Sequence, residues 1–456
     1  MSQLRRLDRR GFLKSAGTTV VRGSVGAKSA SATRVLDAPP PPSGTPPQPN
    51  QSYDFDEIYD RSGTNCSKWD NVRDRFDTEI EVAMGVADMD FRSAPCVTRA
   101  LAERCKHENW GYARRPESYL QAIVDWNQRR YGLEIDPSTL QWSTGVHTGI
   151  IAGLMTFAPP GSRVLLTTPA YNGFYSDLRF TRTVPDESLM RLVDGHYSID
   201  FDDFERRARR SNVFILCNPQ NPTGNAWSPQ ELTRMGEICL EHRVVMLVDE
   251  IHCDFIRSDA AYTAFASLPN KEIVDNSITF KSASKSFSMS GLKVAWYFSN
   301  NRDYLERIGA NSRGSLNTLG VEANHAALTE GDDWLDGLLP YLDGNHEYVE
   351  SYVAENIPLV KYRKAQGTYL AWLDVTDLGE RIGAERTAAE ERASSGTEVT
   401  ADEIVQRWLV ENARIYLNAG SSYGAGGAGH MRMNLGTSRR LVERALENMA
   451  EALANA

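Results

Sequence analysis

Five short apolar runs along the middle of the chain constrain its fold more than any other feature. They are rich in β-branched residues and comprise residues 163–168, 213–217, 244–248, 278–280 and 294–298. Such runs fit strands that are buried on both faces of a mostly parallel sheet. Helical patterns separate them, among them residues 116–131 and 230–242. This alternation predicts a large, doubly wound α/β domain over residues 95–335, with ligands bound at the carboxyl ends of its strands.

The other folded residues, 53–94 and 336–456, are expected to form a second, smaller α+β domain. A long helical pattern spans residues 333–357, and we expect Pro340 to kink or break it. Further along, the pattern predicts strands at 367–374 and 431–434, helices at 401–411 and 438–454, and a polar surface insertion at 385–398.

Residues 1–52 are expected to lie outside the folded domains. Arg9-Arg10-Gly-Phe12-Leu13-Lys14 resembles a twin-arginine export signal. The uncharged stretch that follows is short, whereas a secretory signal has roughly 7–15 apolar residues at this point. Residues 1–32 are therefore either an export signal or a disordered basic tail, and the protein is either exported or cytoplasmic. Residues 33–52 are rich in proline and predict an extended linker.

The composition argues against several classes of partner. The net charge is −10, with both signs interspersed, which disfavours nucleic acid as the main partner. No apolar run approaches the ~20 residues of a membrane span. A zinc site at His252 and Cys253 is not expected, because adjacent residues of a strand point to opposite faces.

A lysine surrounded by hydroxyl groups is the strongest candidate for chemistry. Lys285 follows a strand-like run, residues 276–281, and lies between Ser282, Ser284 and Ser286. A lysine amine can form a Schiff base with the aldehyde of pyridoxal 5′-phosphate, PLP. Hydroxyl and backbone N–H groups can hold the phosphate of such a cofactor.

Two features upstream add the other groups that a PLP enzyme needs. Asp249 ends the apolar run 244–248, and Asn221 lies in the turn Asn-Pro-Gln-Asn-Pro-Thr-Gly, residues 218–224. A carboxylate against the pyridine nitrogen keeps the ring protonated, so that it draws electrons from the substrate. Asp249 is alternatively a helix cap, and residues 218–224 are alternatively a plain turn.

Several motifs, taken in order, resemble those of a known family. They are Tyr53-Asp-Phe-Asp56, Trp69-Asp70, Val86-Ala-Asp-Met-Asp-Phe91, Gly111-Tyr112, Pro169-Ala-Tyr171, Asp249-Glu-Ile-His252, Ser282-Ala-Ser-Lys285 and Gly367-Thr-Tyr-Leu-Ala-Trp372. The chain resembles the fold-type I PLP-dependent enzymes of the aspartate aminotransferase superfamily. Within that superfamily it is most similar to the MalY/PatB branch of cystathionine β-lyases.

The resemblance implies roles around the cofactor ring. Lys285 would bind PLP and, once the substrate displaces it, would remove the α-proton. Asp249 would face the pyridine nitrogen, and Asn221 and His252 would face the 3′ oxygen of the cofactor. Tyr171 would stack on the ring.

The resemblance also implies ligands for the phosphate. Ser282 and Ser284 would donate hydroxyl hydrogen bonds. The backbone at Gly145, Val146 and His147, where a strand gives way to a helix, would donate N–H groups.

Three more positions follow from the same family pattern. Lys293 stands where many aminotransferases have an arginine that pairs with the phosphate. Tyr112 matches a tyrosine that reaches the site of the neighbouring subunit, which implies a homodimer with shared active sites. Arg432 would bind the α-carboxylate of an L-amino acid substrate through its planar fork.

The expected function is an α,β-elimination that cleaves a C–S bond and gives pyruvate, ammonia and a thiol. One alternative is a class I/II aminotransferase. Another is a specialised biosynthetic enzyme of the same branch that acts on an unusual amino acid, for which Trp296 hints at a reshaped surface. A protein that binds a transcription regulator through an exposed apolar patch is an alternative from a different class.

Overall fold

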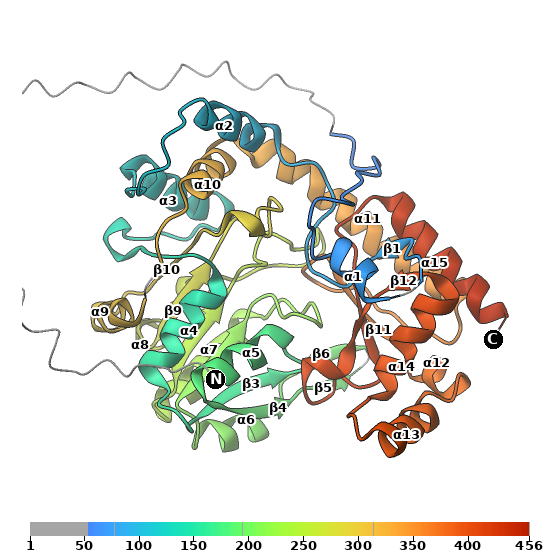
Figure 1. Cartoon of the computed structure of the whole chain (residues 1–456). Coiled ribbons are helices and arrows are strands. Elements are labelled where there is room, and N and C mark those ends of the chain that lie inside the picture. Colours follow the sequence, from blue (N-terminus) through green and yellow to red (C-terminus); the bar gives the residue numbers. More distant parts are fainter. Residues whose placement is uncertain (1–52, 77, 194, 313, 456) are drawn as a thin grey trace, which may run out of the picture. The chain divides into compact units, whose positions relative to one another are not determined.

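A seven-stranded sheet organises the larger part of the fold (Figure 1). The computed structural model describes residues 53–455 apart from 77, 194 and 313. In sheet order the strands are β2 (Gln141–Ser143), β10 (Ala295–Phe298), β9 (Ser277–Lys281), β8 (Val245–Asp249), β7 (Val213–Cys217), β3 (Arg163–Thr168) and β4 (Val184–Leu189). Strands β9 to β4 run parallel, whereas β10 is antiparallel to both of its neighbours.

Helices cover both faces of this sheet, because its inner strands β7, β8, β9 and β10 are buried on both sides. In β7, Val213, Ile215 and Cys217 face one helical layer, and Phe214 and Leu216 face the other. The first layer contains α4 (Val146–Phe157), α5 (Asn172–Thr181) and α9 (Arg302–Asn311). The second contains α6 (Phe201–Ala208), α7 (Pro229–Glu241) and α8 (Lys271–Asp275). The predicted doubly wound α/β fold is therefore confirmed.

A separate core surrounds a three-stranded sheet. Its strands are β11 (Leu370–Asp374), β14 (His430–Asn434) and β13 (Asn418–Ala419). The helices that pack around it are α11 (Asp332–Asn356), α13 (Ala384–Ser395), α14 (Ala401–Trp408) and α15 (Arg439–Ala454). Met431 and Met433 of β14 face this core, which leaves Arg432 and Asn434 on the opposite side of the strand.

A third helical group contains α2 (Pro95–Cys105), α3 (Glu117–Tyr131) and α10 (Thr318–Glu330), which lie together at the top of Figure 1. Residues 53–455 belong to one compact unit. The domain boundaries drawn from the sequence, 53–94 with 336–456 against 95–335, stay a prediction.

The structure bears on two expectations about the second half of the chain. Helix α11 is continuous through Pro340, so it is not broken there, and a kink at Pro340 stays a prediction. Pro340 and Asp336 are exposed, so water can reach the carbonyl that loses its N–H partner, and buried Leu338 and Leu342 anchor the helix on both sides. Residues 385–398 are mostly exposed, as expected for a surface segment, and most of them form α13, which buries Ala384 and Ala388.

The expectations for residues 1–32 and 33–52, an export signal or tail and a proline-rich linker, lie outside the described residues. Within the described part of the chain, no helix is both long and apolar enough to cross a membrane.

Candidate active site

Site residues from distant parts of the sequence meet at the carboxyl ends of the central strands. Asp249 is the last residue of β8, Asn221 follows β7, and Lys285 follows β9. Arg432, from β14 of the other sheet, donates to Asn221 Oδ1 over 3.1 Å. Parallel strands bring such residues together because their carboxyl ends share one edge of the sheet. These residues lie at the edge of the sheet where the sequence predicts that ligands bind.

Lys285 is half-buried, and its amine lies in a setting suited to a nucleophile. Its Nζ donates to the carbonyl oxygen of Ala87, which also accepts the hydroxyl of Tyr369 at 3.2 Å. Burial lowers the pKa of Lys285 to about 8, although the carboxylates of Asp88 and Asp249 act in the opposite direction. A larger share of the amine is therefore neutral near pH 7 than for an ordinary lysine, and the neutral amine is the form that attacks an aldehyde.

Asp249 is a buried carboxylate that suits a cationic ligand. Among the described residues its side chain accepts one hydrogen bond, from the N–H of Ile251 at 3.0 Å. Burial raises the pKa of Asp249 to about 6, although this hydrogen bond acts to lower it. Burying a carboxylate without a cation is unfavourable. A protonated ring nitrogen at this position would compensate for the lost hydration.

His147, in the first turn of α4, connects two other polar residues. Its Nδ1 lies 2.7 Å from Asp177 Oδ2, and its Nε2 lies 3.2 Å from the hydroxyl of Tyr171. Burial acts to lower the pKa of His147, but the hydrogen bond and charge of Asp177 raise it above the ordinary value. The pair orients His147 against Tyr171, the expected stacking residue.

His252 is also buried and is held in the neutral form. Burial lowers its pKa well below the ordinary value, and the charges of Lys285 and Arg432 act in the same direction. Its ring lies edge-on to Tyr369, with centroids 5.6 Å apart. Its Nδ1 is buried and has no partner among the described residues. Such an unpaired atom fits a ligand that supplies the missing hydrogen bond.

Arg432 is a buried arginine without a carboxylate partner among the described residues. Besides Asn221, it donates through Nη2 to the carbonyl of Gly85 over 2.7 Å. Its guanidinium lies 5.2 Å from the ring centre of Tyr423, and its Nε has no partner in the described part of the chain. A buried guanidinium that still has a free N–H can bind the carboxylate of an amino acid.

The side chains expected to bind the phosphate differ in their hydrogen bonds and in their exposure. Ser282 donates its hydroxyl to the carbonyl of Val294 at 2.7 Å and accepts the N–H of Ser284 at 3.0 Å. In this arrangement the hydroxyl hydrogen of Ser282 is already used within the chain. Ser284 is half-buried, and Lys293 is exposed. Their roles stay predictions.

For the remaining residues singled out from the sequence, the structure shows either a backbone position at the start of a helix or the exposure of the side chain. Gly145 is the N-cap of α4 and Val146 is its first residue, so the free N–H groups of this helix start there. The side chain of Tyr112 is fully exposed. Trp296 is only 2% exposed and packs in a hydrophobic core, so it does not reshape a surface.

Several residues of the site were given no role from the sequence. They are Gly85, Ala87, Asp177, Tyr369, Tyr423 and Asn434. Gly85 and Ala87 act through backbone carbonyls. Because every residue type has a backbone carbonyl, the sequence alone does not reveal such a role. Ala87 and Tyr369 nevertheless belong to motifs that match the family, which is the signal that could have found them.

The fold and the site are those of a PLP-dependent enzyme, and the comparison with known families agrees with this class. Residues 79–449 match the family described as aminotransferase class I and II. This match covers most of the chain, and the protein therefore belongs to that family.

Individual relatives are similar over nearly the whole of their own length. The chain is 34% identical to cystathionine beta-lyase PatB of Bacillus subtilis, over 88% of this chain and 99% of that protein. It is 30% identical to protein MalY of Escherichia coli, over 88% and 99% of the two chains. A solved structure of cystalysin from Treponema denticola, which contains PLP, matches with a TM-score of 0.80 at 26% identity, covering 88% of this chain and 99% of that one.

Proposed function

We propose that the protein is a PLP-dependent C–S β-lyase that converts an L-amino acid carrying sulfur at its β-carbon into pyruvate, ammonia and a thiol. One observation carries the proposal: a lysine with a lowered pKa, a buried carboxylate and a buried arginine meet at one edge of the sheet. The relatives that bear the name cystathionine beta-lyase support the choice of reaction.

The described residues fit the cofactor. Asp249 offers a buried negative charge to the ring nitrogen, His252 offers an unpaired Nδ1, and Tyr171 offers an aromatic face. When bound, PLP withdraws electrons from the α-carbon of the amino acid and so makes its proton removable. The family's PLP-containing structures support the same cofactor here.

The protein's own groups then supply binding and proton transfer. Arg432 holds the α-carboxylate, and Lys285 Nζ, free once the substrate amine has taken its place, removes the α-proton. The carbonyl of Ala87, supported by Tyr369, orients this freed amine. The electron pair of the Cα–H bond would form a Cα–Cβ double bond as the C–S bond breaks. The electron pair of the C–S bond would leave with sulfur as a thiolate, which takes up a proton to give the thiol. Water then converts the remaining carbon skeleton to pyruvate and ammonia.

Product analysis separates this reaction from transamination. Purified holoprotein mixed with L-cystathionine and no keto acid is expected to release pyruvate and ammonia continuously in equal amounts. An aminotransferase would stop after one turnover under these conditions, because its cofactor would retain the amino group. Loss of the visible absorbance band of the bound cofactor without pyruvate release would therefore contradict the lyase proposal and favour the aminotransferase.

We also propose a homodimer with shared active sites. The fully exposed side chain of Tyr112 supports it, because a tyrosine buries much apolar surface when it finds a partner. In such a dimer Tyr112 would reach the phosphate and the substrate in the neighbouring subunit.

A further inference from the structure

Residues 85–89, which we call the carbonyl segment, contact both Lys285 and Arg432 through backbone carbonyls. Each of its five carbonyl oxygens accepts a hydrogen bond from a side chain. The donors are Arg432 to Gly85 (2.7 Å), Asn434 to Val86 (2.6 Å), Lys285 and Tyr369 to Ala87, Asn434 and Lys68 to Asp88 (2.8 and 3.0 Å) and Arg61 to Met89 (3.0 Å). One part of the segment thus holds Lys285 and Arg432, and its far end is held by Arg61 and Lys68.

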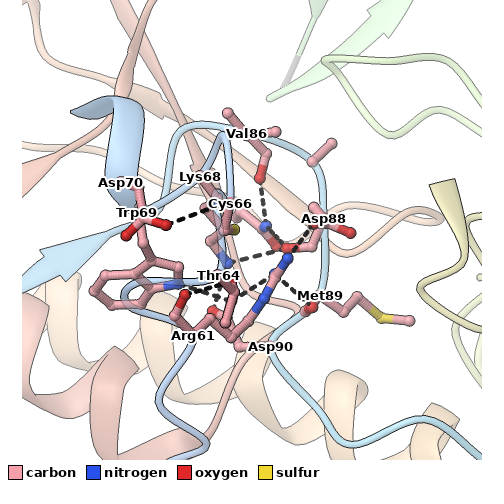
Figure 2. Close-up of polar contacts among 12 residues, drawn as sticks. Arg61, Thr64, Cys66, Lys68, Trp69, Asp70, Val86, Asp88, Met89 and Asp90 are labelled. Atoms are coloured by element: carbon pink, nitrogen blue, oxygen red, sulfur yellow. Dashed lines mark hydrogen bonds and ion pairs between the residues drawn. The ribbon is translucent and has the colours of Figure 1, made fainter. Parts of the chain in front are cut away.

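The far end belongs to a buried cluster of charges around Asp90 (Figure 2). Lys68 Nζ lies 2.5 Å from Asp90 Oδ2, and both side chains are almost fully buried. Arg61 contacts Asp90 Oδ1 at 3.0 Å and Asp88 Oδ2 at 2.6 Å. Trp69 Nε1 donates to Asp90 Oδ1 over 3.0 Å. We call Arg61, Lys68, Trp69 and Asp90 the Asp90 cluster.

The Asp90 cluster permits few arrangements of the carbonyl segment. Buried charges must keep their partners, because leaving one of them unpaired is strongly unfavourable. The donors that pair with Asp90 also bind the backbone, since Lys68 and Arg61 each contact a carbonyl of the segment. A backbone tied to a buried, fully paired network is held in one position.

We propose that the Asp90 cluster consists of positioning residues, which fix the carbonyl segment and thereby set where Lys285 and Arg432 lie. The effect of this positioning on catalysis rests on the proposed function. The cluster contains none of the residues expected to bind cofactor or substrate, and it acts through the carbonyl segment, whose Gly85 and Ala87 carbonyls hold Arg432 and Lys285. A cluster that served stability alone would leave the placement of Lys285 unchanged when it is weakened.

Arg61→Met tests this role against a matched control, Arg207→Met. Both arginines bridge two aspartates, since Arg207 pairs with Asp186 at 2.6 Å and with Asp203 at 2.7 Å. Their side chains are exposed to similar extents, 20% for Arg61 and 27% for Arg207. Arg207 lies in α6, outside the site. Both variants should lower Tm, and only Arg61→Met should change the reactivity of Lys285.

The decisive readout is the rate at which the cofactor-free protein recombines with PLP, followed by the absorbance of the bound cofactor. Arg61→Met is expected to slow recombination and to lower kcat/KM by about tenfold or more, because small misplacements of reacting groups have effects of this size. Arg207→Met should match wild type in both. Trp69→Phe, which removes one donor to Asp90 and keeps an aromatic ring, should show a smaller loss of the same kind.

Equal recombination rates in wild type, Arg61→Met and Trp69→Phe, with only Tm reduced, would overturn the positioning role. If Arg61→Met does not fold, the recombination rate of Trp69→Phe decides alone. Recombination needs no amino acid, so its outcome does not depend on whether the protein cleaves C–S bonds. A wild type that recombines with PLP but releases no pyruvate would count against the proposed function only.

Discussion

Replacing Lys285 with alanine is expected to lower kcat by at least about 10³-fold. The variant loses the amine that binds the cofactor covalently and, in the proposed mechanism, the base that removes the α-proton. It should also lose the visible absorbance band that comes from the bond between lysine and PLP. Steady-state pyruvate release and an absorbance spectrum of the same preparation measure both effects.

Lys281 offers a control for this substitution, because it is a buried lysine only four residues away in the chain. Its Nζ lies 3.8 Å from Glu250 Oε2 and 4.1 Å from the ring centre of Tyr131. Lys281→Met should reduce Tm through the loss of these contacts while the cofactor band remains. If Lys285→Ala kept a tenth of the wild-type activity, Lys285 would not be the catalytic base.

Arg432→Met is expected to lower kcat/KM by about 10²–10³-fold, mainly through a higher KM. Removing one partner of a buried, hydrogen-bonded charge pair has an effect of roughly 2–5 kcal/mol, and each 1.4 kcal/mol is a factor of about ten. The α-carboxylate of the substrate would then enter a buried site without a partner. The cofactor band should persist, because Arg432 is not expected to bind PLP.

Arg432→Lys is the informative companion variant. It keeps the positive charge and lacks the planar fork, so its kcat/KM should lie between those of Arg432→Met and wild type. A KM that is unchanged in Arg432→Met would show that the carboxylate binds elsewhere, and Arg432 would then be only a structural link between Asn221 and Gly85.

The strands were the most predictable part of the fold. The runs at 163–168 and 213–217 became β3 and β7 with the same bounds, because continuous apolar, β-branched residues suit strands buried on both faces. The continuity of helix α11 was harder to predict, because a proline weakens a helix locally. The burial of Leu338 and Leu342 outweighs that loss. Helix α13 was missed because only two of its residues are buried.

The candidate site likewise contains some residues that the sequence pointed to and others that it did not. Lys285 and Asn221 were singled out because each follows a recognisable strand and Asp249 because it ends one, and Arg432 was singled out from the family pattern. Their roles stay predictions. Trp69 and Asp90 of the Asp90 cluster belong to motifs that match the family, but Arg61 and Lys68 gave no signal, because a sequence does not mark which charged residues are buried, and lysine almost never is. Lys68 is nevertheless 1% exposed. Its burial depends on Asp90, twenty-two residues away in the chain.

Every role proposed for this site depends on a covalent bond between Lys285 and the cofactor. Sodium borohydride reduction of the holoprotein, followed by proteolysis and mass mapping of the peptides, tests that bond most directly. One modified peptide is expected, with the added mass of the reduced cofactor on Lys285. Modification of a different lysine, or a protein that binds PLP and yields no modified peptide, would contradict the assignment of this site.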